Sequence, residues 1–412
     1  MLDAGLGGGA RDRGELHELG AGADDADDSH DGRVYKVDSM AESGAGDPAI
    51  DPAIDLVIAV HSPERPVERA VSSALAGPVD GPPVRVTVVC HDLDPAIVAA
   101  RLGALADDAR VRLLAHGDGI RSPSGPFNAG LDAATGEWVA IMGSDDELEA
   151  GALAAWHARA RAMGADIVLP RIVRRDAAGR DATVATPPAR PGRRTRLDGV
   201  RDRLSYRSAP LGLLRRALVG ATRFGGGLSQ GEDVLFSARL WFSGATIALA
   251  DGPAYVVHDD ARDRVTLTAR PLATTLAFID EVLDDRWFRA LPEASRDALG
   301  AKLLRINVLG EFVNRPDPGQ WSSGERDALA RLVRSIRAAA PSAIETMSIA
   351  DRRLLDALPS DSGADARRLL ALARARRAYG RPATLLTRSP RRVLAREAPL
   401  RMMAASFARR SR

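Results

Sequence analysis

Several residue types are scarce in this 412-residue chain, and each scarcity excludes a class of protein. The single cysteine, Cys90, excludes an intrachain disulfide and a zinc site made of several cysteines. No apolar run approaches the roughly 20 residues that a transmembrane helix needs. Of the 57 lysine and arginine residues, only Lys36 and Lys302 are lysines. The N-terminus lacks the basic start and apolar core of a secretory signal, so a reducing, cytoplasmic location is expected.

The net charge of +2 hides an uneven distribution of charge along the chain. Residues 1–50 carry 12 acidic and four basic residues and few side chains suited to a core, so we predict a disordered acidic tail. Residues 361–412 carry 14 arginines and three acidic residues. This basic end either docks on the body of the protein or lies on an anionic membrane surface as a peripheral contact. Its lack of interleaved aromatic residues argues against nucleic-acid binding.

Residues 51–270 show apolar runs of strand length that alternate with helical patterns. This alternation predicts an α/β domain: a Rossmann-type, mostly parallel sheet with helices on both faces. An Arg-, Pro- and Gly-rich stretch over 174–210 predicts a long loop, and residues 271–412 predict an all-helical C-terminal domain. The expected strands are 54–60, 84–89, 111–114, 138–142 and 166–169, and the helices between them are 67–75, 127–134 and 149–163.

Two adjacent carboxylates, Asp145 and Asp146, follow the expected strand 138–142. In parallel sheets, ligands bind beyond the carboxyl ends of the strands, and hard carboxylate oxygens there suit Mg²⁺ or Mn²⁺. The alternative is structural, because an acidic residue before a helix can cap its N-terminus. Taken alone, the pair favours neither interpretation.

Four features in order give the chain a resemblance to a known family. It resembles the family 2 glycosyltransferases, which have the GT-A fold, over roughly residues 52–260. The features are Leu56-Val57-Ile58-Ala59-Val60-His61-Ser62 before a helix, Asn128-Ala129-Gly130 before Ala134-Thr135-Gly136-Glu137, Ser144-Asp145-Asp146, and Gly231-Glu232-Asp233-Val234-Leu235-Phe236 at a helix start.

The resemblance implies roles for specific residues on the donor side. The family's D-x-D motif falls on 143–145, so Asp145 is the expected metal ligand, with Ser144 and Asp146 beside the donor. Gly143 replaces the first Asp of the motif. His61 matches the position beside the nucleotide base, and Asn128 is a further donor-side candidate. Asp92 is a shifted candidate for reading the base, because Cys90-His91-Asp92 stands where the family usually has two aspartates.

The resemblance also implies the catalytic base and a second possible metal ligand. The acidic pair of the family matches Glu232 and Asp233, with Asp233 the better candidate for the base. The alternative is that both residues merely begin a helix, where the dipole favours acidic side chains. His258 matches a metal-ligand histidine of some members, and its alternative is a histidine at a strand end.

Together these features predict an inverting, metal-dependent glycosyltransferase with Mg²⁺ or Mn²⁺ as its cofactor. Its expected partners are a nucleotide-sugar donor and a glycan or lipid-linked acceptor, and the expected setting is cell-surface or exopolysaccharide synthesis. A catalytically silent scaffold of the same fold is the main alternative. A nucleotidyltransferase is less favoured, because residues 60–65 lack the glycines of a phosphate-binding loop.

Overall fold

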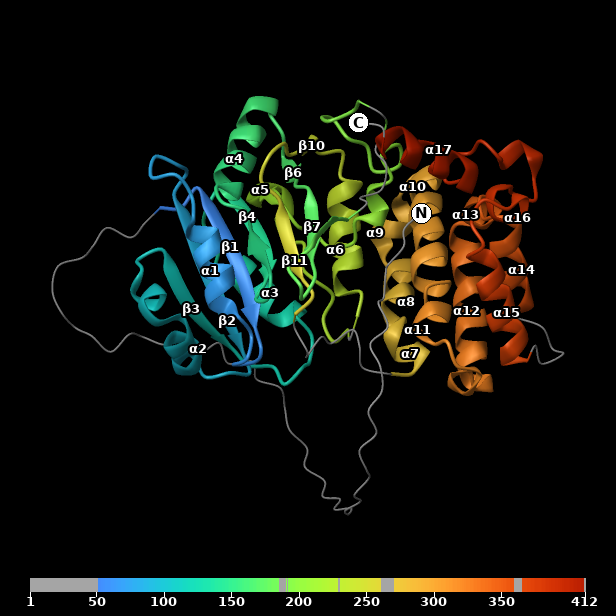
Figure 1. Ribbon diagram of the computed structural model, residues 1–412, viewed down its shortest axis with the longest axis horizontal. Helices are drawn as coiled ribbons and strands as arrows, with labels where there is room; N and C mark the ends of the chain where they lie inside the picture. Colours follow the sequence, from blue (N-terminus) through green and yellow to red (C-terminus); the bar gives the residue numbers. More distant parts are fainter. Residues whose placement is uncertain are drawn as a thin grey trace, which may run out of the picture.

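A computed structural model of the chain describes residues 51–184, 190, 192–228, 230–260, 270–358 and 365–410. The predicted acidic tail, 1–50, lies outside the described residues. The described chain forms two regions side by side: an α/β region and a region of helices (Figure 1). No helix of the described residues is both long and apolar enough to cross a membrane.

The α/β region is built on a seven-stranded sheet in the order β10-β6-β9-β4-β1-β2-β3. Neighbouring strands are parallel except at β9, which is antiparallel to both β4 and β6. The predicted α/β fold with a mostly parallel sheet is therefore confirmed. The strands are β1 (Ile54–Val60), β2 (Val84–His91), β3 (Val111–His116), β4 (Trp138–Gly143), β6 (Ile167–Leu169), β9 (Leu213–Arg215) and β10 (Ile247–Leu249).

Both faces of this sheet are buried, which explains the continuous apolar runs of its strands. Along β1, Leu56 and Ile58 face one core and Val57 faces the other. Helices α1, α2 and α4 cover the first face, and α3 and α6 cover the second. These helices are α1 (Val67–Leu75), α2 (Pro95–Leu102), α3 (Ser124–Asp132), α4 (Ala152–Met163) and α6 (Glu232–Trp241); a short α5 (Arg216–Val219) follows β9.

A second sheet of four short strands, in the order β5-β11-β7-β8, lies beyond the end of β4. It comprises β5 (Glu147–Leu148), β7 (Ile172–Arg175), β8 (Asp181–Thr183) and β11 (Tyr255–His258). The sequence predicted a helix from about 149 and a loop over 174–210, so β5, β7 and β8 were missed. The N-cap interpretation of Asp145 and Asp146 is wrong, because β5 separates them from α4. The N-cap of that helix is Gly151, which makes no side-chain capping bond.

The C-terminal region is helical, as predicted, and one large apolar core holds it together. That core includes Val234 and Ala238 of α6, so α6 packs on the sheet with one face and on the helical region with the other. The predicted domain boundary at 270 stays a prediction. The helices are α7 (Leu272–Thr275), α8 (Ala277–Asp284), α9 (Arg286–Ala290), α10 (Glu293–Lys302), α11 (Glu311–Asn314), α12 (Ser323–Ala339), α13 (Pro341–Glu345), α14 (Ile349–Ala357), α15 (Ala366–Arg376), α16 (Pro382–Leu385) and α17 (Pro399–Arg410), with a π-helical turn over Leu303–Val308.

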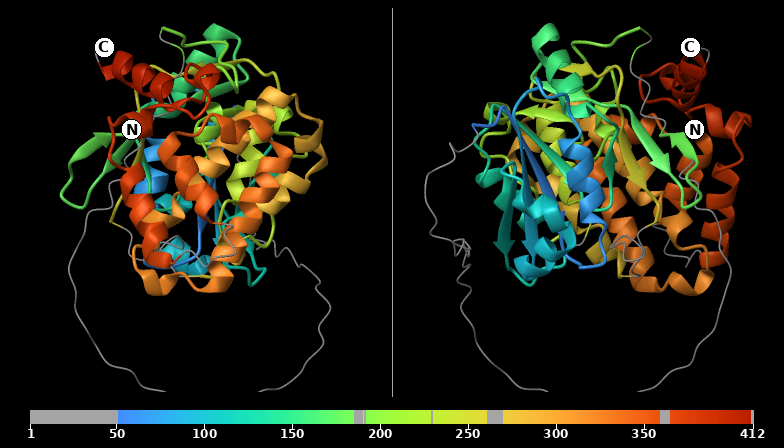
Figure 2. Two further views of the ribbon diagram at one scale, coloured as in Figure 1. Left: turned by 90° about the vertical axis from the view of Figure 1, so that its right-hand side faces the viewer. Right: turned by 60° about the vertical axis from the view of Figure 1, so that its left-hand side comes forward.

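The basic end docks on the body through a buried acidic residue, and α17 lies across one end of the helical region (Figure 2). Glu397 is 6% exposed and accepts a hydrogen bond of 2.8 Å from the hydroxyl of Tyr206. Its carboxylate lies 3.4 Å from Arg305 and 3.7 Å from Arg203. These contacts support the docking interpretation, while a peripheral membrane contact stays a prediction.

Glu397→Ala is expected to lower the free energy of unfolding by about 3 kcal/mol or more, because it leaves Arg203 and Arg305 buried without their anion. Chemical denaturation measures the change. Arg391→Ala, at an exposed position of the same segment, is the control and should stay within about 0.5 kcal/mol of the parent. Equal stability of both variants would show that Glu397 does not anchor the tail.

Candidate active site

A cavity of about 970 Å³ opens where the carboxyl ends of β1, β2 and β4 meet the start of α6 and the helical region. The predicted site residues divide into two groups around it. Six of them line the cavity: His61, Asp92, Ser144, Asp145, Glu232 and Asp233. The other three, Asn128, Asp146 and His258, are not among its lining residues.

Asp145 enters the cavity directly after β4, and its charge is already balanced there. One of its carboxylate oxygens lies 2.6 Å from the guanidinium of Arg65, and the two side chains are 14% and 8% exposed. Arg69 donates a hydrogen bond to the main-chain oxygen of Asp145. This part of the cavity therefore holds the Asp145 carboxylate beside the Arg65 guanidinium, a set that can bind a phosphate group, a divalent cation or both.

Gly143 stands where the family pattern has its first Asp, and the space for a side chain there is taken. A Cβ at this position would lie 2.7 Å from a carboxylate oxygen of Asp146 and 3.1 Å from one of Asp145. Asp146 accepts a 2.6 Å hydrogen bond from the hydroxyl of Tyr255, which itself accepts one from the Gly143 main chain. Burial, followed by the charge of Asp146, raises the pKa of Tyr255 well above its usual value, so Tyr255 stays a neutral donor.

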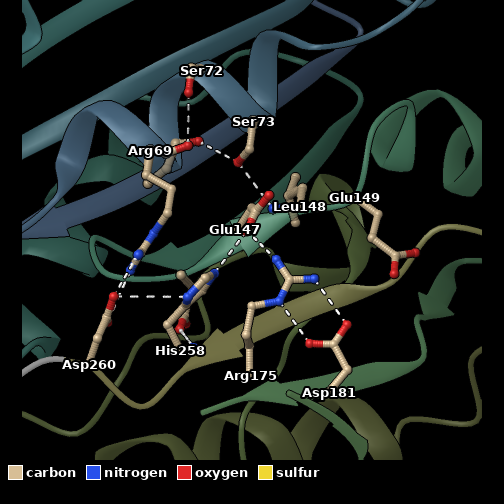
Figure 3. Close-up of polar contacts among 12 residues, drawn as sticks. Arg69, Ser72, Ser73, Glu147, Leu148, Glu149, Arg175, Asp181, His258 and Asp260 are labelled. Carbon is tan, nitrogen blue, oxygen red and sulfur yellow. Dashed lines mark hydrogen bonds and ion pairs between the residues drawn. The ribbon is translucent and has the colours of Figure 1, made fainter. Parts of the chain in front are cut away.

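His258 lies at the end of β11 among charged side chains rather than on the cavity (Figure 3). Its Nε2 is 2.8 Å from Glu147 and its Nδ1 is 4.0 Å from Asp260. Arg69 pairs with the same Asp260 at 2.7 Å. This network ties the second sheet to α1, and the role of His258 as a metal ligand stays a prediction.

Asn128 does not line the cavity either, and its side chain bonds to another segment of the chain. Its amide nitrogen donates to the Phe224 carbonyl at 3.1 Å, and its oxygen accepts from the Phe224 main-chain nitrogen at 2.9 Å. The two bonds fasten α3 to the segment that leads into α6. The structure thus gives Asn128 a supporting position, and direct contact with the donor stays a prediction.

The acidic pair at the start of α6 is held in an environment that resists ionisation. Burial, and next the adjacent Asp233 carboxylate, raise the pKa of Glu232 to about 7. Burial also raises the pKa of Asp233, whereas the Lys302 ammonium opposes that rise. Carboxylates with raised pKa values in a cavity are typical of groups that move protons. Both residues do begin a helix, as the alternative stated, but they also face the cavity.

The sequence missed a cluster of two histidines and a carboxylate at the carboxyl ends of β2 and β3. His91 and His116 are register partners on these strands. Their Nε2 atoms lie 2.7 and 3.1 Å from the two oxygens of Asp118. Burial would raise the pKa of Asp118, but hydrogen bonds from both histidines and the Ile120 main chain keep it below its usual value. Two imidazoles and a carboxylate can hold a transition metal, and a histidine ending each of two neighbouring strands was the available signal.

The same cluster positions Asp92. The side chain of Asp92 accepts hydrogen bonds from the main chains of Asp118 and Gly119, at 3.2 and 3.3 Å. Its backbone is left-handed, with φ of 49°. Asp92 therefore fixes the loop that follows β3 while also lining the cavity, which is compatible with its predicted place beside the base of the donor.

The helical region supplies the wall that faces Asp145. Its residues on the cavity include Arg270, Phe278, Lys302 and Asn307. One nitrogen of Arg270 and the side-chain oxygen of Asn307 are buried without a hydrogen-bond partner. A buried polar atom without a partner is costly, so this wall has a donor and an acceptor suited to the hydroxyl groups of a ligand.

Most of the α/β region is similar to a known protein family. Residues 55–221 match the model of glycosyl transferase family 2. This part of the chain is therefore similar to that family. The match contains Asp92 and Asp145 but ends before α6, so Glu232, Asp233 and the helical wall lie beyond the matched residues.

One curated protein is also similar to a part of this chain. A stretch of 96 residues is 42% identical to the succinoglycan biosynthesis protein ExoO of Rhizobium meliloti (strain 1021). It covers 23% of this chain and 26% of ExoO. The chain therefore spans about a quarter of the length of this curated relative.

Solved structures extend the likeness in fold beyond residues 55–221. The S. aureus TarS fragment 1–349 in complex with UDP-GlcNAc matches with a TM-score of 0.59 at 18% identity. The same fragment with UDP matches with a TM-score of 0.57 at 17% identity. Each covers 79% of this chain and 91% of the fragment.

Proposed function

We propose that the protein is an inverting glycosyltransferase that moves a sugar from a nucleotide-sugar donor to a hydroxyl group of a cell-surface or exopolysaccharide glycan. One observation carries the proposal: Asp145, which follows β4, and Asp233, on α6, line the same cavity from two different parts of the chain. The similarity to glycosyl transferase family 2, the UDP-GlcNAc complex of TarS and the biosynthetic role in the name of ExoO support the reaction class and setting.

The donor diphosphate is proposed to bind beside Asp145. Arg65 places a guanidinium there that can pair with phosphate oxygens. A divalent cation also fits, because Mg²⁺ in nucleotide sites uses one or two carboxylates and completes its shell with phosphates and waters. Asp145 would hold that cation, which would neutralise charge on the leaving diphosphate. The nucleotide base is proposed to lie near His61 and Asp92.

The acceptor is proposed to enter against the helical wall, where Arg270 and Asn307 present their unpaired polar atoms. Its hydroxyl oxygen attacks the anomeric carbon while the bond to the diphosphate breaks, and its proton passes to Asp233. General base catalysis of this kind typically contributes about 10²–10⁴ in rate. A single displacement from the face opposite the diphosphate inverts the anomeric carbon. A lipid-linked form of the acceptor is part of the proposal.

A thermal-shift measurement separates the proposed enzyme from a silent scaffold. UDP, GDP, CDP and TDP are each tested at saturating concentration with and without Mn²⁺. One of them should raise Tm by several degrees, because a hundredfold excess over Kd stabilises the folded state by about 2.7 kcal/mol. Absence of a shift with all four would contradict a nucleotide-sugar enzyme.

A further inference from the structure

Lys302 is an unusual residue in this chain, both in its chemistry and in its place. It is the one lysine in the part of the chain that the structure describes, against dozens of arginines. Its side chain is 1% exposed, and it lines the cavity from the last residue of α10. A lysine ammonium changes its proton affinity when buried, whereas an arginine guanidinium stays charged. Position 302 therefore holds a basic side chain whose pKa depends on its surroundings.

Lys302 and the start of α6 pack on the same aromatic ring. The Lys302 nitrogen lies 6.0 Å from the centre of the Phe278 ring. On the α6 side, a Cβ at Gly231 would lie 2.4 Å from this ring, and Gly231 has a left-handed φ of 76°. Glycine is thus required immediately before the acidic pair, and the ring sets the approach of α6 to α10.

The other carboxylates on the cavity already have partners, and those of Asp92 are the main chains of Asp118 and Gly119. Glu311 pairs with Arg315 at 3.2 Å, and Asp145 pairs with Arg65. Arg270 adds a second positive charge to the helical wall. Among the described cavity residues, Glu232 and Asp233 are then the anions that Lys302 can balance. Of the two, Asp233 is the one whose charge acts on Lys302, opposing the burial that lowers the pKa of Lys302 to about 8.

We propose that Lys302 is a positioning residue for sugar transfer: its ammonium group stabilises the ionised carboxylate of Asp233 and so makes Asp233, rather than Glu232, the base. This inference rests on the proposed function of the cavity. The acceptor proton moves to Asp233, and the electron pair of the broken glycosidic bond leaves with the diphosphate. Lys302 supplies charge only and exchanges no atom.

The coupling can be measured without any substrate, because the chain has two lysines. Protein labelled with ¹³C at the lysine ε-carbon gives two NMR signals, and Lys302→Arg identifies the one from Lys302. That signal should titrate near pH 8, and in Asp233→Asn its midpoint should fall by about one unit or more. Asp107→Asn, at an exposed site off the cavity, is the control. An unchanged midpoint in Asp233→Asn would overturn the proposal.

The pH dependence of turnover tests the catalytic consequence. The acidic limb of kcat/KM should move up by about one pH unit or more in Lys302→Met, because Asp233 loses the charge that favours its ionised form. Lys302→Arg keeps that charge and should keep the limb close to the wild-type position. The proposal would be overturned if Lys302→Met and Lys302→Arg had the same Tm and the same pH midpoint for the acidic limb of kcat/KM. Failure of the protein to turn over any donor, with the NMR coupling intact, would count against the proposed function instead.

Discussion

Asp233→Asn is expected to lower kcat for sugar transfer by roughly 10²–10⁴-fold. The amide keeps the shape of the side chain but cannot accept the proton of the acceptor hydroxyl. Binding of the nucleoside diphosphate should not change, because Asp233 lies on α6 and the helical side of the cavity rather than beside Asp145. Calorimetry with the diphosphate and a turnover assay with the complete donor separate the two quantities.

Glu232→Gln is the matched comparison for Asp233→Asn. Asp233 contributes to the raised pKa of Glu232, so Glu232→Gln removes one member of a repelling pair and should not lower Tm. Asp233→Asn also removes the charge that balances buried Lys302, so its Tm is measured beside its kcat. Glu232→Gln should retain more than a tenth of the wild-type kcat. If Asp233→Asn kept turnover while Glu232→Gln abolished it, the roles of the two carboxylates would have to be exchanged.

Asp145→Asn is expected to remove the dependence of donor binding on a divalent cation. In the wild type, Asp145 repels a bound diphosphate unless Arg65 and a cation compensate, so Mg²⁺ or Mn²⁺ should tighten nucleoside diphosphate binding by roughly 10- to 100-fold. In Asp145→Asn the Arg65 guanidinium loses its ion pair with residue 145 and can pair with phosphate oxygens instead. Affinity without metal should then equal or exceed that of the wild type, while added metal should change it little.

Calorimetric titration of the diphosphate, with and without Mn²⁺, measures all four affinities. Ser62→Ala, a change near Arg65 that alters no charge, serves as the control and should keep the response to metal. A wild-type affinity that ignores Mn²⁺ would contradict metal binding at Asp145. It would leave Arg65 as the group that neutralises the leaving diphosphate.

Elements with long, uniform patterns were predictable from the sequence. The strand Ile54–Val60 and the helix Val67–Leu75 have the bounds expected, because their apolar spacing is set by burial on a large core. The second sheet was not predictable. β5 has two residues and the three residues of β8 are exposed, so neither shows the period of a strand.

The candidate site was predictable where residues adjacent in sequence carry the chemistry. Asp145 follows a strand and Asp233 lies at the start of a helix. The order of the family motifs along the chain indicated both residues. Contacts between distant segments were not predictable. No pattern brings Lys302 to Asp233 or Tyr255 to Asp146, because these pairs depend on how α6 and the second sheet pack. The helical pattern of the C-terminal region also gives no sign of the π-helical turn that follows Lys302.

The central claim is that this cavity transfers a sugar with Asp233 as the base. It is tested most directly by release of nucleoside diphosphate from a panel of nucleotide sugars, with water as the acceptor. The wild-type protein should release diphosphate from one donor class, and Asp233→Asn should release none above the rate without enzyme. Release that is equal in the two proteins, or absent from the wild type with every donor, would contradict the account.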